Sequence, residues 1–260
     1  EMRVKTFLFL LTILWLGSIA YGANQPPPTE TTLRSGKCFL YTAKKFGVPI
    51  LKAAIKIENG TMEQGKPSYQ VCANVESLQY YGLFFRMNNR FTSTVDREAC
   101  FPVRYVKEID QEGLLIKRKN YIQTFTFDHS QKKVVVKKHG ENGKQEISLP
   151  PETYDPLSIF ARYYLRDELH PGKDIPISLY DGIKLRQMVF HSMKERVRSR
   201  MYGEVEAVCL KSTTPFSSFG DQEGTISIWY LDERVRIPLL MELGLPVGNV
   251  TFELEAVEEI

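Results

Sequence analysis

Polar and apolar residues alternate along most of the chain after residue 36, in short stretches separated by turn-forming residues. Alternation with a period of two predicts strands that bury one face. The clearest case is the pair 121–127 and 132–138, which flanks a turn and predicts a half-buried hairpin. Similar patterns predict strands at 38–46, 49–58, 68–75, 90–95, 100–109, 174–180, 184–192, 203–213, 225–231, 237–243 and 248–256.

One segment has the period of a helix instead. Asp155 is a good N-cap, and Pro156 suits the first helical position because its missing N–H has no helical partner there. An apolar stripe follows at Leu157, Phe160, Ala161, Tyr164 and Leu165. We therefore expect a helix over 155–167. The apolar spacing at 78–87 also fits a second, short helix, although Gly82 weakens that pattern.

The number of strands predicts how the sheet is arranged. Asn59-Gly60 is typical of a hairpin turn, and the neighbouring strands are expected to be antiparallel. A sheet of this size either splits into a sandwich or curls into a barrel. We expect a mainly β fold, a strongly curved antiparallel sheet or half-open β-barrel of about a dozen strands, with the 155–167 helix packed against its concave side. The range 36–258 is expected to form a single domain, since no long linker interrupts it.

The first 23 residues have a different pattern. Arg3 and Lys5 precede an apolar run at 7–20, and small residues then lead into a proline-rich stretch. This pattern predicts a signal peptide over 1–23, followed by a disordered lead-in over 24–35. A membrane-spanning helix needs about 20 apolar residues, so no stable transmembrane anchor is expected after cleavage. The expected location is the periplasm.

The charge gives no reason to expect a polyanionic partner. The chain has 34 Lys and Arg residues against 31 Asp and Glu, a formal net charge of +3. Loss of residues 1–23 removes one acidic and two basic residues and leaves a charge near +2. The basic runs at 117–119 and 194–200 alternate with other residues and are interpreted as solvated strand faces. Nucleic acid is therefore not an expected partner.

Four cysteines, Cys38, Cys72, Cys100 and Cys209, have long spacings that resemble no metal or redox motif. An oxidising compartment would allow disulfides, with three possible pairings, but buried free thiols are an equally open alternative. One pairing is disfavoured. In a meander, Cys38 and Cys72 would lie two strands apart, about 9.5 Å, beyond the roughly 7 Å that a disulfide spans.

Motifs for catalysis, metals or cofactors are lacking in the sequence. The histidines are scattered at His129, His139, His170 and His191, without the spacing of metal ligands. There is no phosphate-binding loop, dinucleotide fingerprint or G-x-S-x-G elbow. The carboxylate pair Glu204 and Glu206 is better explained as a solvated strand face. We expect no catalytic residue, no metal and no cofactor, and keep a hydrolase with an unrecognised site as a remote alternative.

Aromatic residues are the most suggestive feature, with 15 Phe, 13 Tyr and 2 Trp. In a curved sheet that holds a helix, clustered aromatic side chains either fill the core or line an apolar cavity for an acyl chain or similar ligand. The sequence leaves both alternatives open. The candidate ligand-binding residues are Tyr81, Phe84, Phe85, Phe160, Tyr164 and Trp229.

Four stretches carry a family resemblance: 41–54 (YTAKKFGVPILKAA), 155–166 (DPLSIFARYYLR) with Pro171-Gly172 after it, 228–238 (IWYLDERVRIP) and 248–254 (GNVTFEL). Their order and spacing, over about residues 36–256, resemble the bacterial exported family called domain of unknown function 3108 (DUF3108). The resemblance implies an exported, mostly antiparallel β protein without established catalytic residues. The four cysteines and the 24–35 segment depart from the family pattern. At the level of fold alone, the expected sheet is similar to periplasmic carriers of the LolA/LolB type.

Together these observations predict an exported, non-enzymatic protein that binds a hydrophobic or lipidic envelope component in its curved sheet. The alternative is a structural or interaction protein of the cell envelope, with a filled core and another envelope protein as its partner.

Overall fold

A computed structural model of the protein describes residues 34–63, 65–82, 84–114, 118–166, 169–216, 221–233 and 235–260. The first eight strands are β1 (Lys37–Lys45), β2 (Val48–Glu63), β3 (Lys66–Ser77), β4 (Phe85–Asp96), β5 (Pro102–Gly113), β6 (Lys119–Asp128), β7 (Lys133–Lys138) and β8 (Gln145–Ser148). The others are β9 (Thr153–Tyr154), β10 (Asp174–Tyr180), β11 (Leu185–Ser199), β12 (Gly203–Phe216), β13 (Gln222–Leu231), β14 (Pro238–Leu245) and β15 (Gly248–Glu259). Two helices interrupt them, the 3-10 helix η1 (Gln79–Tyr81) and the α-helix α3 (Pro156–Leu165).

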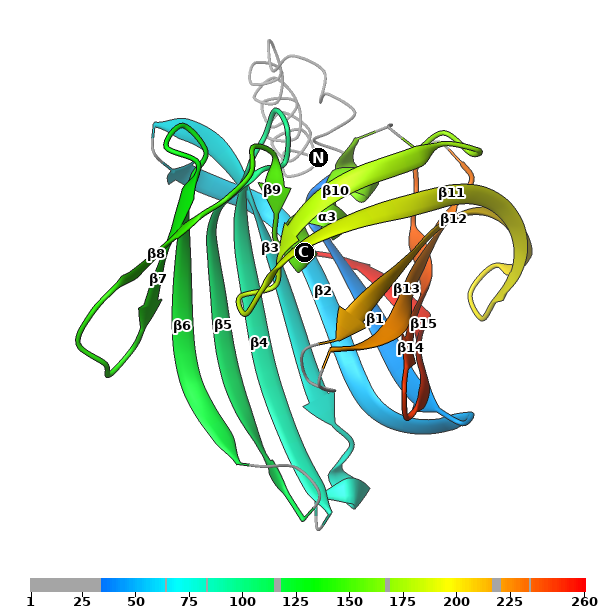
Figure 1. Ribbon diagram of the computed structural model, residues 1–260. Helices are drawn as coiled ribbons and strands as arrows, with labels where there is room; N and C mark the ends of the chain where they lie inside the picture. Colours follow the sequence, from blue (N-terminus) through cyan, green and yellow to red (C-terminus); the bar gives the residue numbers. More distant parts are fainter. Residues whose placement is uncertain are drawn as a thin grey trace, which may run out of the picture. The chain divides into compact units, whose positions relative to one another are not determined.

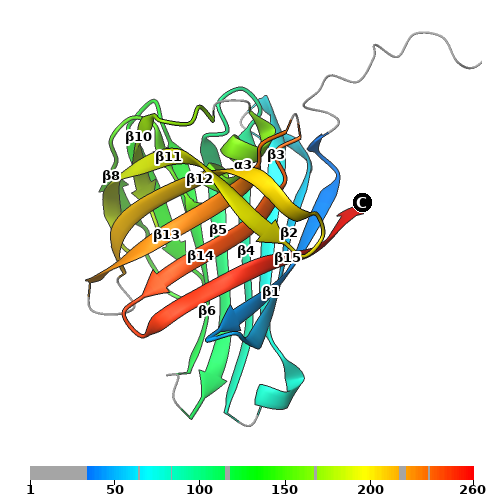
Figure 2. The same cartoon turned by 90° about the vertical axis from the view of Figure 1, so that its right-hand side faces the viewer.

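These fifteen strands form one sheet, in the order β8-β7-β6-β5-β4-β3-β2-β1-β15-β14-β13-β12-β11-β10-β9. Neighbours are antiparallel, except that β9 pairs with β10 in parallel. The first and last strands meet in the middle of the sheet, where β1 pairs with β15. Figure 1 shows the sheet curving so that its two halves face each other, and in Figure 2 strands β11 to β14 cross in front of β4 and β5.

The curved, half-open β-barrel predicted from the sequence is therefore confirmed. Strands β8 and β9 are the two ends of the order, so the sheet curls without joining its ends. The number of strands is larger than the dozen expected, because β8 and β9 are too short to show a period. The antiparallel expectation also fails at the single parallel pair formed by β9.

The alternation of residue types explains which face of each strand is buried. In β2, Ala53, Ile55 and Ile57 are buried, whereas Lys52 on the other face of the strand is exposed. Strand β11 has the same period over Leu185–Ser199, with every second residue buried in its first half. Burial of apolar surface stabilises the folded state by about 25 cal/mol for each Å² removed from water. This gain in free energy drives the sheet to curl around its own apolar face.

Helix α3 confirms the helix expected over 155–167, with Pro156 as its first residue. The Asp155 carboxylate accepts hydrogen bonds from the backbone N–H groups of Leu157 and Ser158, at 2.8 and 2.9 Å. The Ser158 side chain in turn accepts from the Asp155 N–H, which completes a capping box. Eight of its ten residues are buried. The helix lies within the curve of the sheet (Figure 1), where it contacts β3 and β4.

Two local predictions were wrong. Asn59-Gly60 does not form a turn, because β2 continues through it to Glu63. Gly60 instead lets β3 approach, since a Cβ at this position would lie 2.4 Å from the Ser68 hydroxyl oxygen. The 78–87 segment is not an α-helix. Among its described residues, only the three of η1 are helical, and β4 begins at Phe85.

The lead-in predicted over 24–35 ends earlier than expected. Arg34 is buried, and its guanidinium donates to the carbonyl oxygen of Tyr164 at 3.1 Å. Gly36 donates to Ile57 O at 2.7 Å and accepts from Ile260 N at 3.0 Å. Arg34 therefore belongs to the barrel. The predicted signal peptide, and the lead-in up to residue 33, lie outside the described residues.

Asp155 is expected to make stability depend on pH. Burial raises the pKa of this carboxyl from 3.8 to about 6, although Ser93 and two backbone amides donate to it. The folded protein thus binds the proton more tightly than the unfolded chain. The free energy of unfolding therefore falls as pH rises through this interval, and stays lower above it.

The matched variant is Asp155→Asn, which keeps a capping oxygen but does not titrate. From about pH 4 to about pH 7, we expect the wild type to lose about 2 to 3 kcal/mol relative to this variant. Urea unfolding at several pH values measures the difference. A constant difference between the two proteins over this interval would contradict the assignment.

The four cysteines are buried, and no disulfide joins any two of them. Cys38 and Cys72 both pair with Lys56, so they lie in one row two strands apart, as expected. Burial raises the pKa of the Cys209 thiol to about 12 and also raises that of Cys38. Since the thiolate is the reactive form, the folded protein should resist thiol reagents.

Ellman titration checks this expectation. The native protein, purified without reductant, should react slowly, and the denatured protein should show four free thiols per chain. Fewer than four thiols after denaturation, restored by a reductant, would show that a disulfide had formed.

Candidate functional site: an apolar cavity in the barrel

The curved sheet and helix α3 enclose an apolar cavity of about 330 Å³. Its wall comes from β2 and β3, from β10 and β11, from β13 to β15, and from the first turns of α3. The lining residues are Ala53, Ile55, Ala73, Val75, Pro156, Leu157, Ile159, Phe160, Leu179, Met188, Phe190, Ile226, Ser227, Ile228, Met241, Leu243 and Phe252. All of these residues are apolar except Ser227.

Strand register brings these side chains together. Residues that pair across neighbouring strands point to the same face. The lining pairs are Ala53–Val75 and Ile55–Ala73 on one side, and Ile226–Leu243, Ile228–Met241 and Met241–Phe252 on the other. The two alanines, on adjacent strands, leave space that a larger side chain would fill. The cavity therefore follows from small residues on one wall and larger apolar residues on the facing wall.

Apolar side chains continue from the cavity toward the turns at one end of the barrel. Val75 and Phe252 are only partly buried, and they line the cavity and also pack on a second, smaller apolar cluster. This cluster is centred on Ala43, Leu51 and Val250. Its outer members are Ile50, Phe85, Met87 and Leu245, at strand ends next to the turns. An apolar path thus connects the cavity with the barrel end where β1 meets β2 and β14 meets β15.

Lys107 is a buried charge on the same face of the sheet. It pairs with Phe91, which pairs with the cavity residue Ala73. Its ammonium donates to the carbonyl oxygen of Asp181 at 3.3 Å, and burial lowers its pKa. Asp181 belongs to the β10–β11 turn, so this contact holds that turn against β5 on the side where the sheet does not close.

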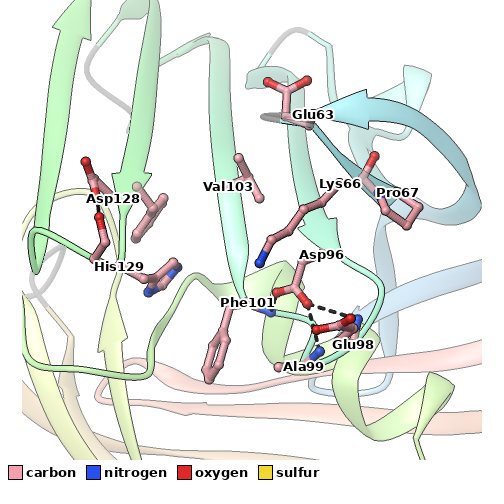
Figure 3. Close-up of a pocket in the computed structure, with 13 residues that line it drawn as sticks. Glu63, Lys66, Pro67, Asp96, Glu98, Ala99, Phe101, Val103, Asp128 and His129 are labelled. Atoms are coloured by element: carbon pink, nitrogen blue, oxygen red, sulfur yellow. Dashed lines mark hydrogen bonds between the residues drawn. The ribbon is translucent and has the colours of Figure 1, made fainter.

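A second, polar pocket of about 370 Å³ lies at the β2–β3, β4–β5 and β6–β7 turns (Figure 3). Two of its acids, Asp96 and Asp128, stabilise their own loops. Asp96 accepts from three backbone amides of the following turn, at 2.8 to 2.9 Å. Asp128 accepts from a hydroxyl and an amide of the β6–β7 turn, which lowers its pKa. The His129 ring lies 2.8 Å from Pro102 O. These contacts explain Asp96, Asp128 and His129 as turn structure, so the apolar cavity is the better candidate site.

The structure places the six predicted ligand-binding residues in different environments. Phe160 lines the cavity. Tyr164, one turn later on α3, is buried in the core, with its ring 5.0 Å from that of Phe39. Trp229 does not line the cavity, and its indole N–H donates to Glu195 at 2.6 Å.

The other three candidates lie around η1. Phe85 packs on the smaller apolar cluster, with its ring 5.7 Å from that of Tyr81. Phe84 is 58% exposed. The structure therefore brings Phe160 to the cavity and Phe85 to the path that leads out of it, and leaves Phe84 at the surface.

Most of the cavity wall was missed by the sequence reasoning, because it consists of aliphatic residues. Alternation predicts which residues of one strand share a face, and it places Ala53 with Ile55. It does not predict which strands face each other across the barrel. The two alanines at inward positions were the available signal, since small residues on an inner face leave volume.

The described part of the chain contains no cluster of three or more His, Cys, Asp or Glu residues arranged to hold a metal ion. Within the same residues, no helix has the length and apolar character needed to span a bilayer.

The fold and the site define a half-open β-barrel with an internal apolar cavity. The family model described as "Protein of unknown function (DUF3108)" matches residues 39–255. The chain therefore belongs to the DUF3108 family, which confirms the resemblance seen in the sequence.

A solved structure supports the fold. The chain is similar to the crystal structure of a beta-barrel-like protein of domain of unknown function DUF1849 from Brucella abortus, with a TM-score of 0.59 and 11% identity. The similarity covers 86% of this chain and 97% of that chain. Comparison with curated proteins gave no match. The likeness to carriers of the LolA/LolB type stays a prediction.

Proposed function

We propose that the protein is an exported, non-enzymatic binding protein that holds a hydrophobic or lipidic component of the cell envelope in the barrel cavity. The observation that carries this proposal is the composition of the cavity wall, in which Ser227 is the single polar residue. Ligand sites are typically concave and mostly apolar, with few polar groups.

The size of the cavity supports a small apolar ligand or one acyl chain. Ligand pockets have volumes of roughly 300 to 1,000 Å³, and this cavity has about 330 Å³. An apolar cavity of about 150 Å³ already binds benzene. Each methylene group buried contributes about 0.8 kcal/mol, so an acyl chain would gain affinity along its length.

Export is proposed from the sequence. A signal peptide typically has basic residues, then an apolar run, then small residues. The chain has Arg3 and Lys5, the apolar run at 7–20, and small residues after it. In an aqueous compartment outside the cytoplasm, an insoluble envelope component needs a protein that shields it from water. N-terminal mass spectrometry of the protein recovered from the periplasm tests this part, because processing near residue 23 is expected.

The alternative, an envelope interaction protein without a small ligand, is favoured by one observation. Strand β8 ends the sheet order, so one side of its backbone is not paired within the sheet. Such an edge can accept a strand from a partner.

Equilibrium binding distinguishes the two functions. The protein is titrated with a fluorescent fatty-acyl probe whose emission rises in an apolar environment. The proposal expects saturable uptake at one site per chain, in competition with unlabelled fatty acid or phospholipid. Emission that stays unchanged, or rises without saturation or competition, would contradict a cavity site and favour the envelope interaction protein.

A further inference from the structure

Six exposed apolar side chains lie at one end of the barrel, on four turns that are separate in sequence. They belong to the β1–β2 turn, the η1 segment, the β5–β6 turn and the β14–β15 turn. We call them the rim; its residues are Phe46, Val48, Tyr80, Phe84, Leu114 and Val247. Their exposed fractions range from 49% for Val48 to 80% for Phe46. Single exposed apolar residues are common on proteins, but a group at one end requires an explanation.

Contacts between neighbouring turns make the rim continuous. Leu114 N donates to Phe84 O at 2.9 Å, which joins the β5–β6 turn to the η1 segment. The Tyr80 hydroxyl donates to Pro49 O at 3.3 Å, which joins η1 to the start of β2. The Phe46 ring covers Gly248, where an added Cβ would lie 2.7 Å from the ring. The four turns therefore form one row across this end of the barrel (Figure 1).

The rim lies at the barrel end that the apolar path from the cavity reaches. The smaller apolar cluster includes Ile50 and Phe85, which are next to the β1–β2 turn and to Phe84. It also includes Val75 and Phe252, which line the cavity. An apolar ligand could thus move from the rim to the cavity along apolar side chains only.

The charges at the rim turns are of one sign. Among the described residues of 45–49, 78–84, 114–118 and 245–248, the charged ones are Lys45 and Arg118, and both are basic. The Arg118 guanidinium also lies 3.8 Å from the carboxylate of Glu112 on β5. The Lys45 ammonium lies 5.6 Å from the centre of the Phe46 ring. The turns at the other end are different, since 63–66, 96–101 and 128–133 contain acids as well as bases. These acids are Glu63, Asp96, Glu98 and Asp128.

We propose that the rim docks the protein on a lipid bilayer, with the mouth of the cavity facing the membrane. Apolar turn residues enter the boundary between headgroups and acyl chains, tyrosine stays at headgroup level, and lysine or arginine beside them contacts anionic headgroups. A proteinaceous partner would need a surface of about 800 Å² with polar groups around it, whereas the rim is one row of turns whose six exposed side chains are apolar or tyrosine. Docking at the mouth lets a lipidic ligand pass between bilayer and cavity without crossing water, and this part rests on the proposed function.

The test places a tryptophan at either end of the barrel. Phe84→Trp replaces a rim residue, and Met62→Trp replaces a residue of similar exposure, 64%, on β2 near the opposite turns. Each variant of the full chain is mixed with vesicles of phosphatidylethanolamine and phosphatidylglycerol that carry bromine atoms on their acyl chains. Residues 1–33 and Trp229 are identical in both variants, so they cannot produce a difference.

We expect the bromolipid to quench emission of Phe84→Trp at least about twofold more than that of Met62→Trp. Equal quenching of both variants, or none in either, would overturn the proposal. A blue shift of the tryptophan emission of Phe84→Trp that depends on protein concentration, in the absence of vesicles, would also overturn the proposal. The rim would then be an interface between copies of this chain.

A second variant separates this proposal from the proposed function. Tyr80→Ser combined with Phe84→Ser should lose cosedimentation with the vesicles and keep uptake of the soluble acyl probe. Probe uptake by the Phe84→Trp variant without bromolipid quenching would leave the cavity function standing and reject docking. Quenching of that variant without probe uptake would support docking and reject the cavity function.

Discussion

Replacing Ala53 by phenylalanine is expected to abolish most ligand uptake while the barrel stays folded. Ala53 lines the cavity, and its neighbour across the strand pair is Val75. A phenyl ring there takes the space of at least two methylene groups of the ligand. At about 0.8 kcal/mol for each group, affinity for an acyl probe should fall by roughly tenfold or more.

Ala54→Phe is the matched control for this experiment. Ala54 is the next residue of the same strand, it points to the opposite face, and it does not line the cavity. Probe affinity should remain within about twofold of the wild type in this variant. Thermal unfolding by circular dichroism shows whether each variant folds, and the smaller Ala73→Leu change serves if Ala53→Phe does not. Unchanged affinity in a folded Ala53→Phe variant would place the probe elsewhere.

Replacing Phe160 by alanine is expected to have the largest effect on stability. Phe160 is 3% exposed, and its ring lies 6.3 Å from that of Phe39 and 6.4 Å from that of Tyr230. Loss of a buried phenyl ring costs about 3 to 5 kcal/mol through lost transfer energy and the space left behind. Urea unfolding should show a loss of that size.

Phe84→Ala is the control for this change, because the same substitution is made at a residue that is 58% exposed. It should change the free energy of unfolding by less than about 0.5 kcal/mol. Similar losses in both variants would mean that Phe84 is buried in solution, and the rim would then have to be redefined.

The sequence predicted the class of fold because its signals are local. Period-two alternation located most strands, and Asp155 with Pro156 marked the start of α3. It failed where tertiary contacts override local preference. Asn59-Gly60 favours a turn, but its position opposite Ser68 and Tyr69 on β3 keeps it in a strand.

The site was harder to predict than the fold. Aromatic residues drew attention to the 78–87 segment, whose members divide between the rim and the apolar cluster. The cavity depends on which strands face each other, which is decided by curvature over the whole sheet. Phe160 and Tyr164 could be tied to the interior from local pattern, because both lie on the apolar stripe of a capped helix, and of these two only Phe160 lines the cavity.

Native mass spectrometry of the protein purified without refolding, followed by organic extraction, tests the central claim most directly. We predict a co-purifying apolar molecule that is present in the wild type and in Ala54→Phe, and strongly depleted in a folded Ala53→Phe variant. An apo mass in all three proteins, together with no uptake of added fatty acid or phospholipid, would contradict a ligand-binding cavity.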